Sequence, residues 1–532
     1  MNEPGERQRV ATRVAKNTAA QMVAMGSTIV SKLLITIVIA RVFGPTAVGD
    51  FAFVITFSTL FTFLATAGLP LTLIREVATH REQAHRYAGA SLGIAGLAGL
   101  GTVPLMWAIA ALMGKSADIQ LAVVLAGIAL AGDALAQVLI GVFNGFERME
   151  LAAAVTITQE LAFLVVGTLV LLLRLPFVWV YAVYVPSRLS GALVGLVIYR
   201  RLFAQPVRLH FEWPFVKMLV RTALPYAANM ALGPVYLRID VVMLSFFQGS
   251  AEVGLYEVAT SIFYRFNVFA RMLNNALMPL MAREFESQAE RIRTYIRAAA
   301  RYQFVLGIPL TAWCVLLADW LIALLFGPSF TGSVLVFRLM TPLIVIRFFS
   351  NTLATALTAV NRQAARSTII AAMALLNIGM NLYALPRYSY LGAAVTSIIT
   401  EVLFYSIVYL VLRRDVPRPL GARFMLKPIA AGAGMVAALL LLRAVLPTSW
   451  ALPEGNTAGG SLALSWLASA LPLLVLMCFT GLIYLGMLFA LGTFNQEERR
   501  WMLRVLQLYR LLPVQARNAV LAPRPPETEK EQ

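Results

Sequence analysis

Residues 44–51, GPTAVGDF, and residues 249–256, GSAEVGLY, are two versions of one pattern that lie 205 positions apart. Each version opens on a glycine, has a second glycine at its sixth position and ends on an aromatic residue. The sequence is therefore predicted to contain two related halves, and the glycines predict tight hairpin turns between neighbouring helices. Weaker matches at offsets of 205 to 214 are Val103-Pro104-Leu105 with Ile308-Pro309-Leu310, Arg75-Glu76 with Arg283-Glu284, and Arg148 with Arg362.

The composition around these segments indicates an integral membrane protein. Hydrophobic residues make up 59% of the 532 residues and charged residues only 13%, with a mean hydropathy of +0.76, whereas soluble domains are about a quarter charged. Cys314 and Cys478 lie in apolar runs, and the three histidines lie in polar connections. A disulfide framework, a zinc site and histidine-based catalysis are therefore not expected.

Fourteen segments are long and apolar enough to cross the roughly 30 Å hydrocarbon core of a bilayer as helices. Each half of the repeat holds six of them, an even number, so the two halves have the same orientation. The prediction is an all-α polytopic membrane protein with two parallel six-helix repeats around a central cavity and two further C-terminal helices. The predicted spans are residues 17–41, 48–68, 88–113, 119–143, 151–173, 177–199, 218–247, 252–280, 298–326, 333–360, 364–386, 389–412, 424–446 and 463–491.

The span count divides the chain into six parts. They are a cytoplasmic N-terminus (1–16), a first six-helix lobe (17–199), a cytoplasmic linker (200–217), a second six-helix lobe (218–412), two additional transmembrane helices (424–491) and a cytoplasmic amphipathic helix with a disordered tail (492–532).

Membrane topology explains most of the net charge of +18. Thirty of the 44 Lys and Arg residues lie in or beside the even-numbered connections and the two termini, against five in the odd-numbered connections. Because cytoplasmic segments carry the excess of positive charge, both termini are expected in the cytoplasm of a cell (inner or plasma) membrane. No nucleic-acid partner is expected.

Nine bases inside the spans are left over after this sorting. Seven of them, but only four of the seven acids in or at the edges of spans, belong to the second lobe. A charge in mid-bilayer costs at least about 2.5 kcal/mol on insertion scales and normally faces a partner or a watery cavity, so the excess predicts a cationic cavity and an anionic cargo. The bases are Lys32, Arg188, Arg221, Arg238, Arg265, Arg271, Arg301, Arg338 and Arg347, and the acids are Asp50, Asp133, Glu160, Asp240, Glu257, Asp319 and Glu401.

Helical spacing places several of these residues on common faces. Span 10 carries a polar stripe that starts at Arg347, and span 8 carries Glu257, Ser261 and Arg265 on one face. Arginine forks fit diphosphate oxygens, and amides and hydroxyls fit sugars. An ion pair with Glu257 is the alternative for Arg265, and Arg188 and Glu401 occupy matching places in spans 6 and 12. The substrate-binding candidates are Lys32, Asn229, Arg238, Arg265, Arg338, Arg347 and Asn351, with Arg338 nearer the outer surface.

The opening of the first half resembles that of the oligosaccharide repeat-unit (O-antigen type) flippases, which are polysaccharide biosynthesis proteins of the multidrug/oligosaccharidyl-lipid/polysaccharide (MOP) exporter superfamily. The matching segments are Ala40-Arg41-Val42-Phe43-Gly44-Pro45, Val48-Gly49-Asp50-Phe51, Gly68-Leu69-Pro70 and Arg75-Glu76-Val77-Ala78. The span count and the repeat extend the resemblance to about residue 491. It implies a MATE-like fold and alternating-access transport of undecaprenyl-diphosphate-linked oligosaccharides from the cytoplasmic to the outer leaflet. The implied partners are this lipid-linked glycan, the bilayer, a polysaccharide polymerase and other assembly proteins.

Other functions remain open. A lipid II flippase would use the same electrostatics, whereas a drug-cation antiporter of the same superfamily needs a carboxylate-lined cavity, and span 1 carries Lys32 and no acid. A membrane glycosyltransferase or polymerase is disfavoured because the sequence has no Asp-x-Asp and no large external loop, so an enzyme is not expected.

The energy source is expected to be an ion gradient or the flux of substrate. No Gly-rich phosphate loop for ATP is present, and no cofactor or metal is expected. Coupling to protons or sodium has three candidate sites, Asp240, Glu257 and Glu401.

Overall fold

The backbone of the long apolar segments is helical, because in lipid its polar groups can pair only with one another. The computed structural model describes residues 4–173, 175–203, 211–284, 289–420, 423–445, 462–494 and 498, and these ranges contain no strand. The helices are α1 (Pro4–Leu60), α2 (Thr62–Thr66), α3 (Leu69–Thr79), η1 (Arg81–Gln83), α4 (Ala84–Leu112), α5 (Ala117–Gly145), α6 (Met149–Leu172), α7 (Val178–Phe203), α8 (Trp213–Phe247), α9 (Ser250–Glu284), α10 (Ala289–Leu316), α11 (Ala318–Phe326), η2 (Pro328–Phe330), α12 (Ser333–Met340), α13 (Leu343–Ala359), α14 (Gln363–Asp415), α15 (Arg423–Val445) and α16 (Leu462–Ala490).

These helices account for the predicted membrane spans. Within the described ranges, ten helices are long and apolar enough to cross a membrane, and α12 with α13, joined at a 44° bend, form an eleventh. Two of the ten, α1 and α14, bend at Gly44 and Ser389 and so supply two spans each. The more polar α9 supplies the remaining span. The prediction of an all-α polytopic membrane protein is therefore confirmed.

Several boundaries differ from the prediction. Helix α1 begins at Pro4, well before the expected start of span 1, and the expected span 298–326 is interrupted between α10 and α11. Hairpin turns are found at Gly44 and Gly249, but Gly49 and Gly254 lie inside helices, where the hairpin prediction is wrong. Of the predicted C-terminal amphipathic helix and tail (492–532), all but 492–494 and Glu498 lie outside the described residues.

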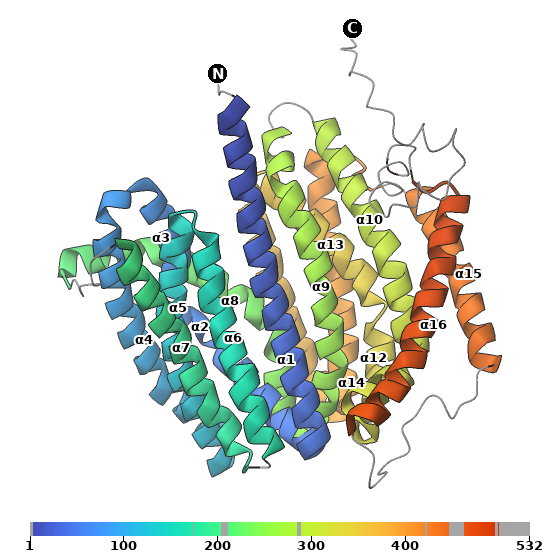
Figure 1. Cartoon of the computed structure of the whole chain (residues 1–532), viewed down its shortest axis with the longest axis horizontal. Helices are drawn as coiled ribbons and strands as arrows, with labels where there is room; N and C mark the ends of the chain where they lie inside the picture. The colour runs from blue at the N-terminus through green and yellow to red at the C-terminus, as the bar shows by residue number, and fades with distance from the viewer. Residues whose placement is uncertain are drawn as a thin grey trace.

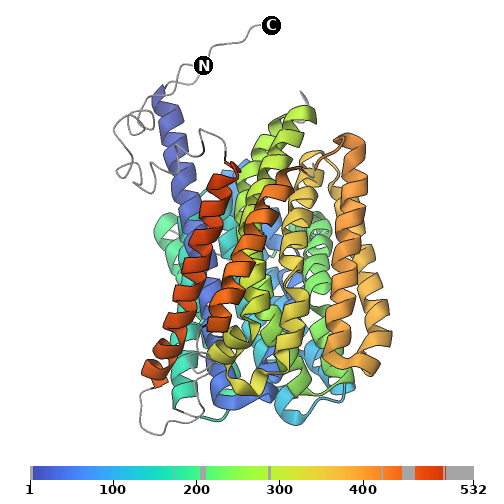
Figure 2. The same ribbon diagram turned by 90° about the vertical axis from the view of Figure 1, so that its right-hand side faces the viewer.

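Two groups of helices lie on either side of α1 (Figure 1): α4, α5, α6 and α7 on one side, and α9, α10, α12, α13 and α14 on the other. Helices α15 and α16 lie at the outer edge of the second group, on the side that faces the viewer in Figure 2. They are attached there through contacts such as the hydrogen bond from Trp313 of α10 to Thr480 of α16, 2.9 Å long. The arrangement agrees with two six-helix lobes and an appended pair.

Helix α8 connects the two lobes. Its first half contributes Phe215 and Leu219 to the hydrophobic core of the first lobe. The turn at Gly68 approaches α8 so closely that a Cβ atom there would lie 2.6 Å from the backbone nitrogen of Ala227. The second half of α8 packs against α14 of the second lobe. A single helix therefore belongs to both halves of the molecule.

The lobes share a hydrophobic core at the end where α1 bends, which we call the Gly44 end (lower end in Figure 1). This core combines Ile39 and Val48 of α1 with Val253 of α9 and residues of α10 to α14. At the opposite end, the cluster around Ile296 and Leu357 contains residues of the second lobe alone. Apart from the first half of α8, which packs into the first lobe, the hydrophobic contact between the lobes is therefore concentrated at the Gly44 end in this conformation.

Candidate functional site

Lys32 of α1 lies among charged groups of both lobes. Its side chain is exposed, and it interacts electrostatically with Glu160, Asp133 and Arg188 of the first lobe and with Arg238 of α8. The bend at Gly44 lies a few turns further along α1, so Lys32 is in the middle of the membrane-spanning part of this helix. Lys32 therefore lies where the two lobes meet, and its role in binding a ligand stays a prediction.

Arg238 of α8 forms an ion pair with Glu257 of α9. Its Nη2 atom lies 2.8 Å from the Oε2 atom of Glu257 and also donates to the hydroxyl of Thr56, at 3.2 Å. About 25% of the Arg238 side chain remains exposed. The guanidinium group therefore keeps an open side although one carboxylate partly neutralises it.

Arg265 lies two turns further along α9 than Glu257. It donates to the backbone carbonyl of Ser261, one turn away on the same helix. No carboxylate of the described residues lies within ion-pair distance of Arg265, because Glu257 pairs with Arg238 instead. The alternative of a simple Arg265–Glu257 pair is therefore wrong, and Arg265, like Lys32, has no ion-pair partner among the described residues.

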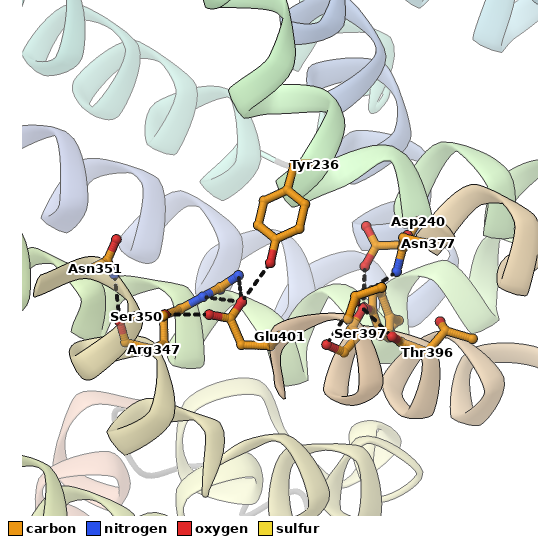
Figure 3. A network of polar contacts seen from close by, with 11 residues as sticks. Tyr236, Asp240, Arg347, Ser350, Asn351, Asn377, Thr396, Ser397 and Glu401 are labelled. Atoms are coloured by element: carbon orange, nitrogen blue, oxygen red, sulfur yellow. Dashed lines mark hydrogen bonds and ion pairs between the residues drawn. The ribbon is translucent and has the colours of Figure 1, made fainter. Parts of the chain in front are cut away.

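Arg347 is buried rather than open to the space between the lobes (Figure 3). It is 7% exposed and forms two contacts with the Oε2 atom of Glu401, from Nη2 at 2.9 Å and from Nε at 3.1 Å. The same carboxylate accepts hydrogen bonds from Ser350, at 2.8 Å, and from Tyr236, at 3.2 Å. The ring of Tyr264 lies 4.8 Å from the guanidinium carbon. This network binds α8, α13 and α14 together and satisfies most of the charge of Arg347.

Of the remaining binding candidates, Asn351 adjoins this network and Arg338 lies away from it. Asn351 follows Arg347 by one turn and donates to its backbone carbonyl at 2.9 Å. Arg338 lies towards the Gly44 end on α12, where it pairs with Asp319, a carboxylate that also contacts Arg443 at 3.4 Å. The side chain of Asn229 lies outside the described residues.

Asp240 is a buried carboxylate whose partners are neutral. It is 4% exposed, and one oxygen accepts a hydrogen bond from the backbone of Val241 at 2.8 Å. The other oxygen accepts from the hydroxyls of Tyr256 and Ser397. Within the described ranges no Lys or Arg nitrogen lies within 4.0 Å of it.

Beside Asp240, α14 contributes a second group of buried polar side chains (Figure 3). Asn381 donates to Asn377 at 2.9 Å and accepts from Thr396 at 2.6 Å, and Asn377 donates to Thr400 at 3.3 Å. In the part of the chain described, no group of three or more His, Cys, Asp or Glu residues could hold a metal ion. A carboxylate beside amide and hydroxyl oxygens is, however, a ligand set suited to a hard monovalent cation or a proton.

The first lobe contains a charged cluster to which the sequence had assigned no binding role. Arg188 lies 3.0 Å from Glu160 and 4.0 Å from Asp133, and Gln159 donates to Asp133 at 3.2 Å. The sequence did contain a signal for this cluster, because Asp133, Glu160 and Arg188 lie in the neighbouring predicted spans 4, 5 and 6 and carry opposite charges. The aromatic residues around the second-lobe arginines, such as Tyr264, had no such signal because aromatic residues are common in every span.

The structure thus brings together Lys32, Arg238 and Arg265 along the line where the lobes meet, since each of the two other bases interacts electrostatically with Arg238. Of the three candidate ion sites, Glu257 and Glu401 are each paired with an arginine, and Asp240 is not. The arrangement can hold an anionic group at the three bases and a cation or proton at Asp240.

Comparisons with solved structures place this geometry in a known fold. The lipid II flippase MurJ, in an inward closed conformation, is 11% identical with a TM-score of 0.70, over 89% of this chain and 99% of that chain. An inward-facing multidrug resistance transporter of the MATE family is 17% identical with a TM-score of 0.59, over 73% and 95% of the two chains. A MOP superfamily transporter from Pyrococcus furiosus, described as having a binding pocket of reverse polarity, is 17% identical with a TM-score of 0.56, over 76% and 96%. The fold is that of the MOP superfamily.

Sequence comparisons define the family. A search of curated proteins finds no match. The MatE family model matches residues 225–383, and the family model described as polysaccharide biosynthesis protein matches residues 14–285. Because the latter match covers more than half of the 532 residues, the chain belongs to the polysaccharide biosynthesis protein family.

Proposed function

We propose that this protein is a flippase that moves undecaprenyl-diphosphate-linked oligosaccharides from the cytoplasmic to the outer leaflet of the cell membrane by alternating access. The observation that carries the proposal is the group of three bases between the lobes, Lys32, Arg238 and Arg265, in which Arg265 has no carboxylate partner among the described residues. A diphosphate supplies the missing anionic partner, and guanidinium groups bind its oxygens in a bidentate manner.

The distribution of charge supports the orientation. The end of the molecule that holds the start of α1 also holds most of the Lys and Arg residues of the connections, so this end faces the cytoplasm under the positive-inside rule. The weaker lobe contact at this end gives a diphosphate headgroup an approach from the inner leaflet. Arg347 acts in this scheme by holding α13 against α14, and Arg338 is a candidate contact on the exit side.

Ion coupling is assigned to Asp240. Glu257 and Glu401 are neutralised by arginines, whereas Asp240 is buried among neutral donors. A buried carboxylate without a basic partner favours uptake of a proton or a cation. A gradient of protons or sodium ions therefore drives the return of the lobes through this site.

A lipid II flippase is the second candidate, because its substrate is also a lipid-linked diphosphate. The fold likeness to MurJ is compatible with this candidate. The three bases do not separate the two candidates, because they would bind the diphosphate of either lipid-linked substrate. A drug-cation antiporter is disfavoured because acids near the three bases are already paired, Glu257 with Arg238 and Glu160 with Arg188. The polymerase and other assembly proteins of the same polysaccharide system are the proposed partners.

The test is deletion of the gene, followed by identification of the lipid-linked glycan that accumulates, and complementation with variants. Arg265→Ala is expected to reduce surface polysaccharide at least about tenfold, since a charged contact to a diphosphate contributes about 1.5–3 kcal/mol. Arg362→Ala, which removes a half-exposed arginine paired with Asp415 outside the site, is the matched control and is expected to complement fully. Accumulation of a peptide-bearing disaccharide lipid identifies lipid II as the cargo, and full complementation by Arg265→Ala at normal protein level contradicts the proposed site.

A further inference from the structure

Gly49 of α1 and Gly254 of α9 lie against each other at the Gly44 end. A Cβ atom on Gly49 would lie 2.9 Å from the backbone nitrogen of Gly254, and a Cβ atom on Gly254 would lie 3.1 Å from that of Gly49. Each added atom would also overlap a carbonyl oxygen, that of Ser250 for Gly49 and that of Pro45 for Gly254. The two backbones therefore meet at a point where any side chain would force them apart.

The contact is reciprocal with respect to the internal repeat. At the offset of 205 positions, Pro45 corresponds to Ser250 and Gly49 corresponds to Gly254. Gly49 contacts Ser250, which is the equivalent of Pro45, and Gly254 contacts Pro45. An interface in which residue i of one copy meets residue j of the other, and j meets i, has twofold symmetry. A local twofold axis that relates the two halves therefore passes through this crossing.

The chemistry of the crossing suits a contact that forms and separates. Ser250-x-x-x-Gly254 is a small-residue motif of the kind that lets membrane helices approach closely, and Gly49 supplies the matching small residue on α1. The neighbouring side chains of Val48 and Val253 are buried and apolar. Separation of the two helices would break the hydrogen bond that the Ser250 hydroxyl donates to the carboxylate of Asp50, but it would break no ion pair among the described residues. Asp50 would keep its interaction with Lys115 of the first lobe, so the cost is lower than that of separating a buried ion pair.

We propose that the crossing of Gly49 and Gly254 is the gate of the Gly44 end, closed in this structure and opened when the lobes separate to release cargo on that side. The inference rests on the proposed alternating-access function and adds the element that controls access at one end. An alanine at either glycine cannot be accommodated in the closed gate, and it therefore shifts the population towards the state in which this end is open.

The experiment measures access to the gate directly and needs no substrate. In a chain with Cys314 and Cys478 replaced by alanine, a reporter Val253→Cys is combined with Gly49→Ala, and a reporter Val48→Cys is combined with Gly254→Ala. The rate of thiol labelling by a hydrophilic maleimide is measured on protein in nanodiscs. Each alanine variant is expected to label at least about tenfold faster than its reporter alone, which corresponds to a shift of about 1.4 kcal/mol in the gate equilibrium.

Matched controls are Gly101→Ala with the Val253 reporter and Gly379→Ala with the Val48 reporter, because both glycines are helical and have open space where a Cβ atom would lie. Unchanged labelling in folded Gly49→Ala and Gly254→Ala chains would overturn the gate and show a permanent packing contact. If these variants do not fold, spin labels at the exposed Thr46 and Thr331 in the glycine background decide the question. A gate that opens and closes gives two distinct distances between the two spin labels. A single distance would overturn the proposal. Because no cargo is involved, a wrong substrate assignment leaves this result unaffected.

Discussion

Asp133 of the first lobe and Arg347 of the second occupy equivalent helices, 214 positions apart, and carry opposite charges. Each faces an oppositely charged residue on the sixth helix of its own lobe: Asp133 lies 4.0 Å from Arg188, and Arg347 lies 2.9 Å from Glu401. Arg188 and Glu401 are themselves 213 positions apart. The repeat has therefore kept an ion pair between its fourth and sixth helices while exchanging the two charges. Because both halves have an ion pair at this place although the two charges are exchanged, the main role of the pair is to hold the fourth and sixth helices together.

The first prediction concerns this connection in the second lobe. Glu401→Gln removes the charge that neutralises Arg347 while leaving the guanidinium buried. Breaking a buried ion pair by removal of one partner costs about 3–5 kcal/mol, so a marked fall in thermal stability in detergent is expected. The double variant Arg347→Met with Glu401→Leu leaves no buried charge and is expected to recover most of the loss.

The control for this cycle is Asp415→Asn, which breaks the pair with Arg362, whose side chain is 54% exposed. An exposed pair contributes about 0–1 kcal/mol, so this variant is expected to melt close to the unmodified protein. Transport by the double variant separates two roles of Arg347. Normal transport means that Arg347 only positions α13 and α14, whereas a stable double variant without transport means that its charge is needed by the cargo.

The second prediction concerns Lys115, in the connection between α4 and α5. Its ammonium group donates to the hydroxyl of Ser245 at 2.7 Å and lies 4.7 Å from the centre of the Phe53 ring. Burial lowers the pKa of Lys115 below its ordinary value of 10.5, and the carboxylate of Asp50 offsets this only in part. The unfolded chain therefore binds more protons than the folded chain between the lowered pKa and 10.5.

Stability rises with pH wherever the unfolded state holds more protons. The unmodified protein is therefore expected to gain thermal stability relative to Lys115→Gln as the pH increases through this window. The comparison cancels the titration of other groups, because both chains share them. A stability difference that is constant with pH, or that changes in the opposite direction, would contradict the assignment of a lowered pKa to Lys115.

Much of the fold could be predicted from the sequence, because the long apolar runs and the offset between GPTAVGDF and GSAEVGLY are local patterns. The site could be predicted only in part. Spacing along one helix placed Glu257 and Arg265 on a common face, but the pairing of Glu257 with Arg238 depends on how α8 crosses α9. The burial of Arg347 depends likewise on the packing of α14, which no pattern within span 10 reveals. The role of Gly49 and Gly254 required knowledge that the two copies touch.

The third prediction concerns Asp240, the buried acid whose partners are neutral. Asp240→Asn keeps a side chain of the same shape. Its remaining oxygen can still accept from the backbone of Val241, and its amide nitrogen can donate to the hydroxyls of Tyr256 and Ser397, so the fold is expected to be retained. It removes the negative charge with which a proton or sodium ion would be bound. Transport in vesicles is therefore expected to lose its dependence on an imposed gradient. Asp319→Asn, at an acid already paired with Arg338 and Arg443, is the control and is expected to keep that dependence. Gradient-dependent transport by Asp240→Asn would place the coupling site elsewhere, and equal loss in both variants would mean that the defect is not specific to Asp240.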